Sequence, residues 1–376
     1  MNINELVRPG LAAMKGYAAI EPVEILEQRM GQRIVKLDGN ENPYGCSPKV
    51  YQSIADYPYY HIYPDPEQRM LRQALEEYTG LSCDHIVCGN GSDELIDLVL
   101  RLFLQPGDEV INCPPTFGMY PVCTEVCGGK VVDVSRDEDF AVDMPGIKRM
   151  LNEKTKVVFV ASPNNPTGNI VSERELIELV DTGRIVVVDE AYFEFSNMTV
   201  ARLVPEHPNL IVLRTFSKWA GLAGLRIGYG IFPVEIAKYL MKIKQPYNIN
   251  AAAQAAALAS LSDVKNLRDT IAKIVAERQR LFTELGGLEW LKPYPSQANF
   301  ILCLLDWHSG PSAHRHPVEQ SDEESAAKLA WRQLRERGIF VRYYDSPGLE
   351  NCLRVSVGRP EDTNILIKTL KEVKHG

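Results

Sequence analysis

The sequence predicts an α/β protein with a mostly parallel sheet sandwiched by helices in a large domain, followed by a smaller α+β domain. Between about residues 84 and 232, short β-branched runs alternate with amphipathic stretches. Most of these runs are apolar throughout, as expected of strands that helices cover on both faces. After about residue 249, long helical patterns replace this alternation, which indicates a second domain.

The predicted strands of the large domain share this continuous apolar character. They cover residues 86–88, 110–113, 130–134, 157–161, 185–188, 210–214 and 227–231. Ligands of such sheets gather at the carboxyl ends of the strands. Polar residues that directly follow these strands are therefore the first candidates for chemistry.

Helices are predicted between the strands. Residues 92–104 carry apolar side chains at helical spacing. A second helix is predicted over residues 173–180, because Ser172 is followed three positions later by Glu175, the pattern of a capping box.

The C-terminal part is predicted to be a smaller α+β domain. The expected elements are helices over 251–261, 264–285, 323–337 and 361–374, and strands over 299–305 and 353–357. We expect a large domain over residues 40–262 and a small domain formed by residues 1–39 and 263–376. The polar, proline-containing stretch 307–325 is interpreted as a peripheral, exposed or disordered insertion.

Composition excludes several classes of protein. At roughly 150 residues per domain, 376 residues suggest two or three domains. The net charge of −8 argues against a nucleic-acid binder, which usually has a basic surface. No apolar run reaches membrane-spanning length, and the first residues are too polar for a signal peptide. The 8 cysteines form no C-x-x-C pair, so we expect a cytoplasmic protein with reduced thiols and no structural metal.

A glycine-containing motif follows the first predicted strand. Residues 89–94 read Gly-Asn-Gly-Ser-Asp-Glu and open a helix. Glycines let the backbone approach an anion, and free N–H groups at a helix start attract phosphate. Ser92 is equally consistent with a simple helix N-cap.

Three further motifs follow later strands. Residues 162–168 are rich in Asn, Pro and Gly, which a turn alone would also require. Asp189 follows four buried apolar residues and needs a cationic or hydrogen-bonding partner, although a helix N-cap or a structural ion pair would also explain it. Lys218 and Arg226 flank a glycine-rich segment, where a lone lysine would usually be surface.

Together and in this order, the motifs resemble those of the fold-type I pyridoxal phosphate (PLP) enzymes, specifically the class I/II aminotransferases. The resemblance runs from Asp-Gly-Asn-Glu-Asn-Pro-Tyr-Gly at residues 38–45 to Val-Ser-Val-Gly at residues 355–358. It implies the PLP-dependent transferase fold, which is aspartate aminotransferase-like, and PLP as cofactor.

The resemblance also implies a role for each matching residue. Lys218 would attach PLP covalently and then move the proton between the substrate Cα and the cofactor, which requires an amine whose pKa a desolvated, cationic site has lowered. Asp189 would pair with the protonated pyridine nitrogen. Asn165 and Tyr192 would hydrogen-bond the phenolic oxygen of the ring.

The phosphate and the ring face are assigned in the same way. Residues near the helix start would hold the PLP phosphate, namely Gly91, Ser92, Asp93, Ser217 and Arg226. Phe117 would stack on the ring, where many relatives carry Tyr.

Within the class, the sequence is most similar to the histidinol-phosphate aminotransferase family. The motifs that carry this likeness lie at residues 16–17, 37–44, 63–65, 245–248 and 352–358. The likeness implies a homodimer with shared active sites, in which Tyr63 reaches the PLP phosphate of the partner subunit. It also implies a set of substrate-binding residues, Tyr17, Asn42, Tyr247, Arg342 and Arg354.

The implied reaction transfers an amino group between L-histidinol phosphate and 2-oxoglutarate, giving imidazole-acetol phosphate and glutamate in histidine biosynthesis. Glutamate carries an α-carboxylate and histidinol phosphate a phosphate, and guanidinium groups bind both anions. Arg342 and Arg354 would accept the two in turn, although Arg342 is also consistent with a surface ion pair.

Other functions share most of these motifs. An aromatic or broad-specificity aminotransferase and a threonine-phosphate decarboxylase would use the same cofactor site. A catalytically idle, PLP-binding regulatory protein is disfavoured by the intact set of Lys218, Asp189, Tyr192 and Arg226.

Overall fold

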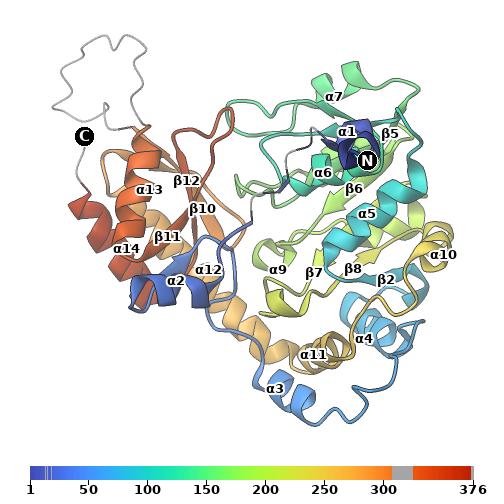
Figure 1. Ribbon diagram of the computed structural model, residues 1–376, viewed down its shortest axis with the longest axis horizontal. Helices are drawn as coiled ribbons and strands as arrows, with labels where there is room; N and C mark the ends of the chain where they lie inside the picture. The colour runs from blue at the N-terminus through green and yellow to red at the C-terminus, as the bar shows by residue number, and fades with distance from the viewer. Residues whose placement is uncertain (13, 15, 18, 307–324, 374–376) are drawn as a thin grey trace.

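The computed structural model describes residues 1–12, 14, 16–17, 19–306 and 325–373, and shows two sheets, each with its own helices (Figure 1). The predicted insertion at residues 307–325 lies outside this part of the chain apart from Ser325.

The larger sheet has the strand order β2-β8-β7-β6-β5-β3-β4. Its strands are β2 (Ile86–Gly89), β3 (Glu109–Asn112), β4 (Lys130–Asp133), β5 (Thr155–Ala161), β6 (Ile185–Asp189), β7 (Leu210–Thr215) and β8 (Gly228–Ile231). Strand β8 runs in the direction opposite to the rest of this sheet, so the sheet is mostly parallel, as predicted. Every one of these strands overlaps a predicted one.

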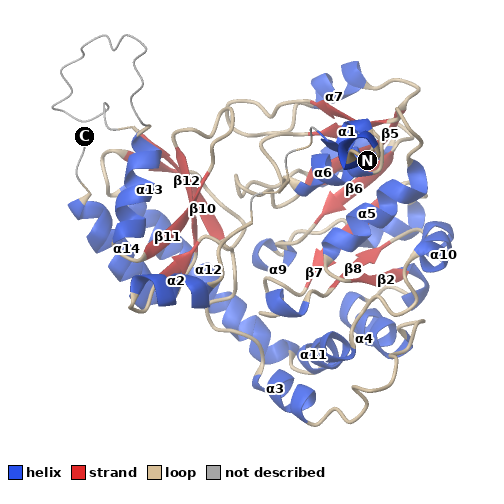
Figure 2. Ribbon diagram, in the orientation of Figure 1, coloured by secondary structure: helices blue, strands red, loops and turns tan. Residues whose placement is uncertain are grey.

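Helices cover both faces of this sheet (Figure 2). They are α3 (Pro48–Ala55), α4 (Arg69–Thr79), α5 (Ser92–Phe103), α6 (Met119–Val126), α7 (Met144–Met150), α8 (Glu173–Val180), α9 (Phe193–Ser196), α10 (Val234–Ile243) and α11 (Ala251–Leu261). Successive residues of β6 alternate between two cores: Val187 packs with α5 and α10, whereas Val186 and Val188 face the opposite cluster. This burial on both faces explains why the strands are apolar throughout.

The smaller sheet has the order β1-β11-β12-β10-β9. Its strands are β1 (Val35–Leu37), β9 (Leu291–Pro293), β10 (Phe300–Leu305), β11 (Ile339–Tyr343) and β12 (Cys352–Ser356). The helices of this part are α2 (Val23–Met30), α12 (Val264–Gly286), α13 (Ala326–Glu336) and α14 (Pro360–Glu372). Because β1 pairs with β11, the N-terminal segment contributes a strand to the C-terminal sheet.

The first residues differ from the expected arrangement. We expected all of residues 1–39 to pack with the small domain, but α1 (Pro9–Ala12) contacts α6 of the large domain. The guanidinium of Arg8 donates to the carbonyl oxygen of Val126 at 2.6 Å. The chain then continues to the small sheet, and residues near Tyr17 line the cavity between the two sheets. The exact domain boundaries remain a prediction.

Two composition-based expectations concern the same described residues. All 8 cysteines are free thiols in the structure. None of the helices in the described ranges is both long and apolar enough to cross a bilayer.

Candidate active site

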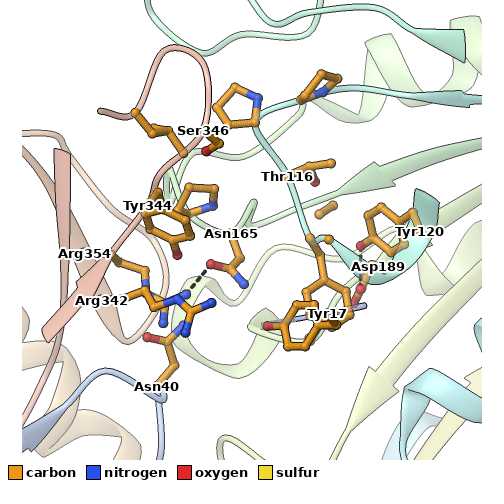
Figure 3. Close-up of a pocket in the computed structure, with 18 of the residues that line it drawn as sticks. Tyr17, Asn40, Thr116, Tyr120, Asn165, Asp189, Arg342, Tyr344, Ser346 and Arg354 are labelled. Atoms are coloured by element: carbon orange, nitrogen blue, oxygen red, sulfur yellow. Dashed lines mark hydrogen bonds between the residues drawn. The ribbon is translucent and has the colours of Figure 1, made fainter. Parts of the chain in front are cut away.

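A cavity of about 1460 Å³ lies between the carboxyl edge of the large sheet and the small sheet (Figure 3). Twelve of the residues singled out from the sequence line it: Tyr17, Ser92, Asp93, Phe117, Asn165, Asp189, Tyr192, Ser217, Lys218, Arg226, Arg342 and Arg354. These residues are far apart in the chain, and the fold brings them together.

The parallel strands explain this convergence. Phe117 and Asn165 lie in the loops after β3 and β5, Asp189 ends β6, and Lys218 follows β7. Because the carboxyl ends of parallel strands meet at one edge, the four side chains face one space.

Asp189 is a buried carboxylate on the cavity wall. Its Oδ2 accepts a hydrogen bond from the Tyr120 hydroxyl at 2.6 Å, and its Oδ1 accepts one from the backbone N–H of Ala191 at 3.0 Å. Burial raises the pKa of Asp189 to about 6, and the Tyr120 hydrogen bond acts in the opposite direction. No Lys, Arg or His of the described chain forms an ion pair with it. A cationic group in the cavity, such as a protonated pyridine nitrogen, would supply the missing counter-charge.

Lys218 also lines the cavity, in the loop that follows β7. Its Nζ donates to the carbonyl oxygen of Gly39 at 3.0 Å and lies 5.9 Å from the ring centroid of Tyr192. Burial, together with the nearby charge of Arg354, lowers the pKa of Lys218 to about 8. Near neutral pH a useful fraction of this amine is therefore unprotonated and nucleophilic.

The start of α5 offers a place for a phosphate. Gly91 has a φ of +79°, and a Cβ there would lie 2.5 Å from Nη2 of Arg226. Because Gly91 has no Cβ, the Arg226 guanidinium can lie close to the free N–H groups at the helix start. Ser217 accepts a hydrogen bond from the Thr215 hydroxyl at 2.9 Å, which leaves its own proton for another acceptor. The Arg226 guanidinium also forms an ion pair with the Asp93 carboxylate at 2.6 Å.

Two arginines enter the cavity from the small sheet. Arg342 of β11 and Arg354 of β12 occupy directly paired positions on neighbouring strands. Arg354 donates to Oδ1 of Asn165 and to the carbonyl oxygen of Asp38, both at 2.5 Å, and its buried Nε has no hydrogen-bond partner. Like charges at paired positions are unfavourable unless an anion lies between them. The pair is therefore suited to a carboxylate or phosphate.

Three predicted substrate or partner contacts do not line this cavity. The amide of Asn42 donates to the carbonyl oxygen of Trp219 at 2.9 Å and accepts from the N–H of Tyr44, so this side chain holds the loop after Lys218. Tyr63 and Tyr247 instead stack on each other at the surface, with ring centroids 4.5 Å apart. Asn42 and Tyr247 are thus not placed for substrate contact in the cavity of this chain.

Sequence reasoning missed two residues of the site. One is Tyr120, because nothing in the local sequence indicates that its hydroxyl donates a hydrogen bond to Asp189. Asn40 lines the cavity with a φ of +52°. Asparagine is one of the few non-glycine residues that adopt this left-handed conformation, and this preference is a sequence signal that could have drawn attention to Asn40.

Comparison with known proteins agrees with this geometry. Residues 32–370 match the family described as aminotransferase class I and II. A histidinol-phosphate aminotransferase of Dehalococcoides mccartyi is 48% identical over 372 residues, covering 99% of both chains. A chloroplastic histidinol-phosphate aminotransferase of Arabidopsis thaliana is 44% identical, covering 98% of this chain and 86% of that protein.

A solved structure gives the same result for the fold. The crystal structure of histidinol-phosphate aminotransferase from Sinorhizobium meliloti, in complex with pyridoxal 5′-phosphate, superposes with a TM-score of 0.82 at 27% identity. The match covers 98% of this chain and 97% of that one. The predicted aspartate aminotransferase-like fold is thereby confirmed. The chain belongs to the class I and II aminotransferases, and within them to the histidinol-phosphate aminotransferase family.

Proposed function

We propose that the protein catalyses PLP-dependent transamination between L-histidinol phosphate and 2-oxoglutarate, a step of histidine biosynthesis. The observation that carries this proposal is the convergence of Lys218 and Asp189 with the arginine pair Arg342 and Arg354 in one cavity. The names of the relatives support the same substrate.

The residues fit PLP as the cofactor. Among the described residues Asp189 has no cationic partner in an ion pair, and the space beside Gly91 and Arg226 suits a phosphate. Phe117 lies on the cavity wall, with Tyr17 packed edge-on against it at 6.0 Å. Bound PLP acts as an electron sink for the substrate Cα.

The chain's own residues would divide the remaining work. The Lys218 amine would take the proton from the substrate Cα and deliver it to the cofactor carbon that is bonded to the substrate nitrogen. Asp189 would stay ionised and pair with the ring nitrogen, and Tyr192 and Asn165 would hydrogen-bond the ring oxygen. Arg354, anchored by Asn165 and the Asp38 carbonyl, presents its guanidinium to the substrate anion.

One anion site serves both half-reactions in this proposal. The carboxylate of glutamate and the phosphate of histidinol phosphate each suit a bidentate guanidinium. With Arg342 beside Arg354, the site has enough positive charge for a phosphate dianion.

We further propose a cytoplasmic homodimer with shared sites. Tyr63 and Tyr247 stack on an apolar surface that also includes the exposed side chains Tyr59, Tyr60 and Ile62. Apolar patches of this kind mark protein interfaces. In the dimer, Tyr63 would reach the PLP phosphate of the partner subunit. The free cysteines support a reducing compartment.

A spectroscopic experiment tests the proposal. Purified protein with PLP should show a visible absorption band that glutamate shifts and 2-oxoglutarate restores. Lys218→Ala should lose the covalently bound cofactor and turnover but keep the fold, whereas Lys238→Ala, which removes an exposed lysine, should change neither. A band that does not respond to glutamate would remove transamination from consideration.

A further inference from the structure

We infer that Asn40 and Ser356 are positioning residues that turn the hydroxyl proton of Tyr192 into the active-site cavity. The inference rests on the proposed function, because the acceptor of that proton would be the ring oxygen of PLP.

Asn40 is held in an unusual backbone conformation. It is 1% exposed, and its φ of +52° lies in the left-handed region, which non-glycine residues rarely adopt. Such a conformation persists where the surroundings fix it, and here the amide of Asn299 donates to the Asn40 carbonyl oxygen at 2.9 Å. The Asn40 backbone N–H also donates to Oγ of Ser356 at 2.8 Å.

The hydrogen bonds fix which way the Asn40 amide faces. The Ser356 hydroxyl, which already accepts from the Asn40 backbone, donates its single proton to Oδ1 of Asn40 at 2.8 Å. The amide oxygen therefore faces Ser356, and the NH₂ group faces Tyr192. Nδ2 of Asn40 donates to the Tyr192 hydroxyl at 2.9 Å.

The Tyr192 hydroxyl is thus an acceptor on the side of Asn40. Its own proton has no acceptor among the residues that the structure describes, although the side chain lines the cavity. Since a phenol has one proton, the Asn40 contact leaves that proton available to a group inside the cavity. If the amide faced the other way, Asn40 would accept the proton and Tyr192 would have nothing to donate.

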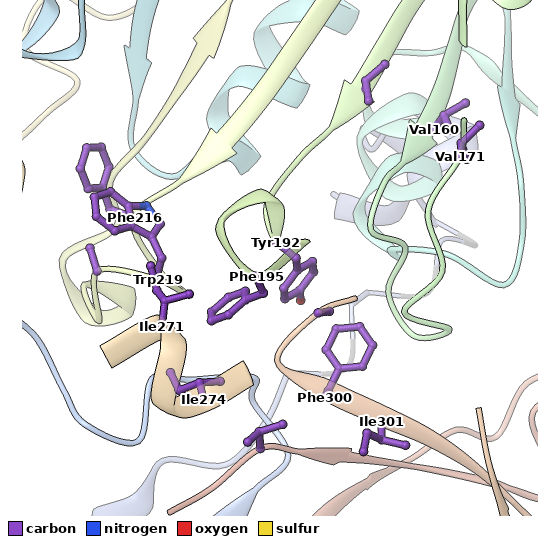
Figure 4. Close-up of a cluster of buried hydrophobic side chains, with 14 of the residues drawn as sticks. Val160, Val171, Tyr192, Phe195, Phe216, Trp219, Ile271, Ile274, Phe300 and Ile301 are labelled. Carbon is purple, nitrogen blue, oxygen red and sulfur yellow. The ribbon is translucent and has the colours of Figure 1, made fainter. Parts of the chain in front are cut away.

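The packing around Tyr192 supports a fixed donor. Its ring contacts Phe300 edge-on, with centroids 5.1 Å apart, in the buried cluster of Figure 4. Burial raises the pKa of the Tyr192 hydroxyl well above its usual range, so the group stays protonated at neutral pH. The other charged or titratable groups that face it are Arg354, Asp189, Tyr344 and Lys218.

The arrangement connects the small sheet with the cofactor site. Ser356 ends β12, the strand that also carries Arg354, and it does not line the cavity itself. A residue outside the cavity therefore sets the hydrogen-bond direction at the ring oxygen.

The test titrates PLP-loaded protein with pH and measures the midpoint at which deprotonation of the bound cofactor shifts the visible absorption band. This midpoint is called the band pKa below. A hydrogen bond donated to the ring oxygen stabilises its negative charge and lowers this pKa. Ser356→Ala leaves the Asn40 amide free to turn, so the band pKa should rise by about 0.5–1 unit, the effect of one hydrogen bond. Tyr192→Phe should raise it at least as much. The double variant should match Tyr192→Phe alone, because Ser356 acts only through Tyr192.

A matched control removes a buried hydroxyl elsewhere. Thr363, near the start of α14, is 1% exposed and its hydroxyl has no hydrogen-bond partner; Thr363→Val deletes this hydroxyl and should not move the band pKa. If Ser356→Ala does not fold, Asn40→Asp replaces it, since an aspartate accepts the Tyr192 proton. The rise in band pKa caused by Asn40→Asp should be larger by about half a unit or more in otherwise wild-type protein than in protein that also carries Tyr192→Phe.

The outcomes separate this inference from the proposed function. A band pKa that stays at the wild-type value in Ser356→Ala, or that rises equally with and without the Tyr192 hydroxyl, overturns the role of Asn40 and Ser356. For Asn40→Asp, equal shifts in both backgrounds overturn it as well. A missing band, or a band that ignores glutamate, contradicts the proposed function instead.

Discussion

At the scale of single residues, burial shifts the pKa values of Asp189 and Lys218 toward neutral pH. The pKa of Asp189 rises to about 6 and that of Lys218 falls to about 8. Burial removes the hydration of each charged form, so the stability of that form depends on the few hydrogen-bonding and charged partners that the fold supplies. Small changes in those partners should therefore alter function at measurable pH values.

Tyr120→Phe tests the partner of Asp189. The Tyr120 hydroxyl lowers the pKa of this carboxyl, so its removal raises the pKa above about 6. The ionised form exists above the folded pKa and is lost as the pH falls through it. PLP affinity, measured by titration between about pH 5 and 8, should therefore fall off at a pH about 1–2 units higher than in wild type, the effect of a hydrogen bond to a charged group.

The control for this variant is Tyr239→Phe, which removes an exposed hydroxyl. It should leave the pH profile of PLP affinity unchanged. Identical profiles for Tyr120→Phe and wild type would mean that the 2.6 Å contact does not influence Asp189.

Arg354→Ala tests the shared anion site. Loss of a charge-assisted guanidinium contact costs roughly 3 kcal/mol, so KM should rise about a hundredfold for both glutamate and histidinol phosphate. Steady-state kinetics with each substrate measure this, and Arg337→Ala, an exposed arginine, serves as control. A rise for one substrate only would separate the two anion sites.

At the scale of elements, a buried ion pair fastens the loop that follows β6. Arg214 of β7 and Glu190 form it at 2.9 Å, and the side chains are 4% and 2% exposed. Glu190 also accepts from the N–H of Val200 at 2.8 Å. Because Glu190 directly follows Asp189, this pair stabilises the strand end that carries the Asp189 carboxylate.

Arg214→Ala should therefore destabilise the protein strongly. Removing one partner of a buried pair typically costs about 3–5 kcal/mol, since the other charge remains buried. Denaturant unfolding measures the loss. In contrast, Arg202→Ala breaks the exposed pair with Glu173, and such pairs contribute at most about 1 kcal/mol. Similar losses in the two variants would contradict the importance of burial.

Element prediction succeeded where the signal was local. The helix α8 begins and ends as predicted, because Ser172 and Glu175 form the expected capping box. The strand β11 was not predicted, since its apolar run is short and ends in the half-buried residues Arg342 and Tyr343. Its pairing opposite β12 depends on tertiary contacts that no local pattern encodes.

At the scale of the whole molecule, the site depends on two sheets that meet across a cavity. The sequence motifs identified cavity residues of the large sheet, because each motif directly follows a predicted strand and the strand ends meet at one edge. The hydrogen bonds of Tyr120 and Asn40 were beyond reach, since they join segments separated by 69 and 152 positions. Asn42 and Tyr247 were assigned from resemblance, and in the structure neither of them lines the cavity.

A mixing experiment tests whether two chains share each site. Lys218→Ala chains have an intact Tyr63, and Tyr63→Ala chains have an intact Lys218. Random reassociation would make half of the dimers hybrids with one intact site of two, so activity should reach about a quarter of wild type. An activity equal to the average of the separate variants would contradict shared sites.

The central claim concerns the substrate, and one measurement tests it most directly. We predict that kcat/KM of the PLP-loaded protein with 2-oxoglutarate is at least about a hundredfold higher for L-histidinol phosphate than for phenylalanine, tyrosine or threonine phosphate, because only histidinol phosphate combines the phosphate with the imidazole side chain. Equal or faster turnover of an aromatic amino acid, or carbon dioxide release from threonine phosphate, would contradict the account.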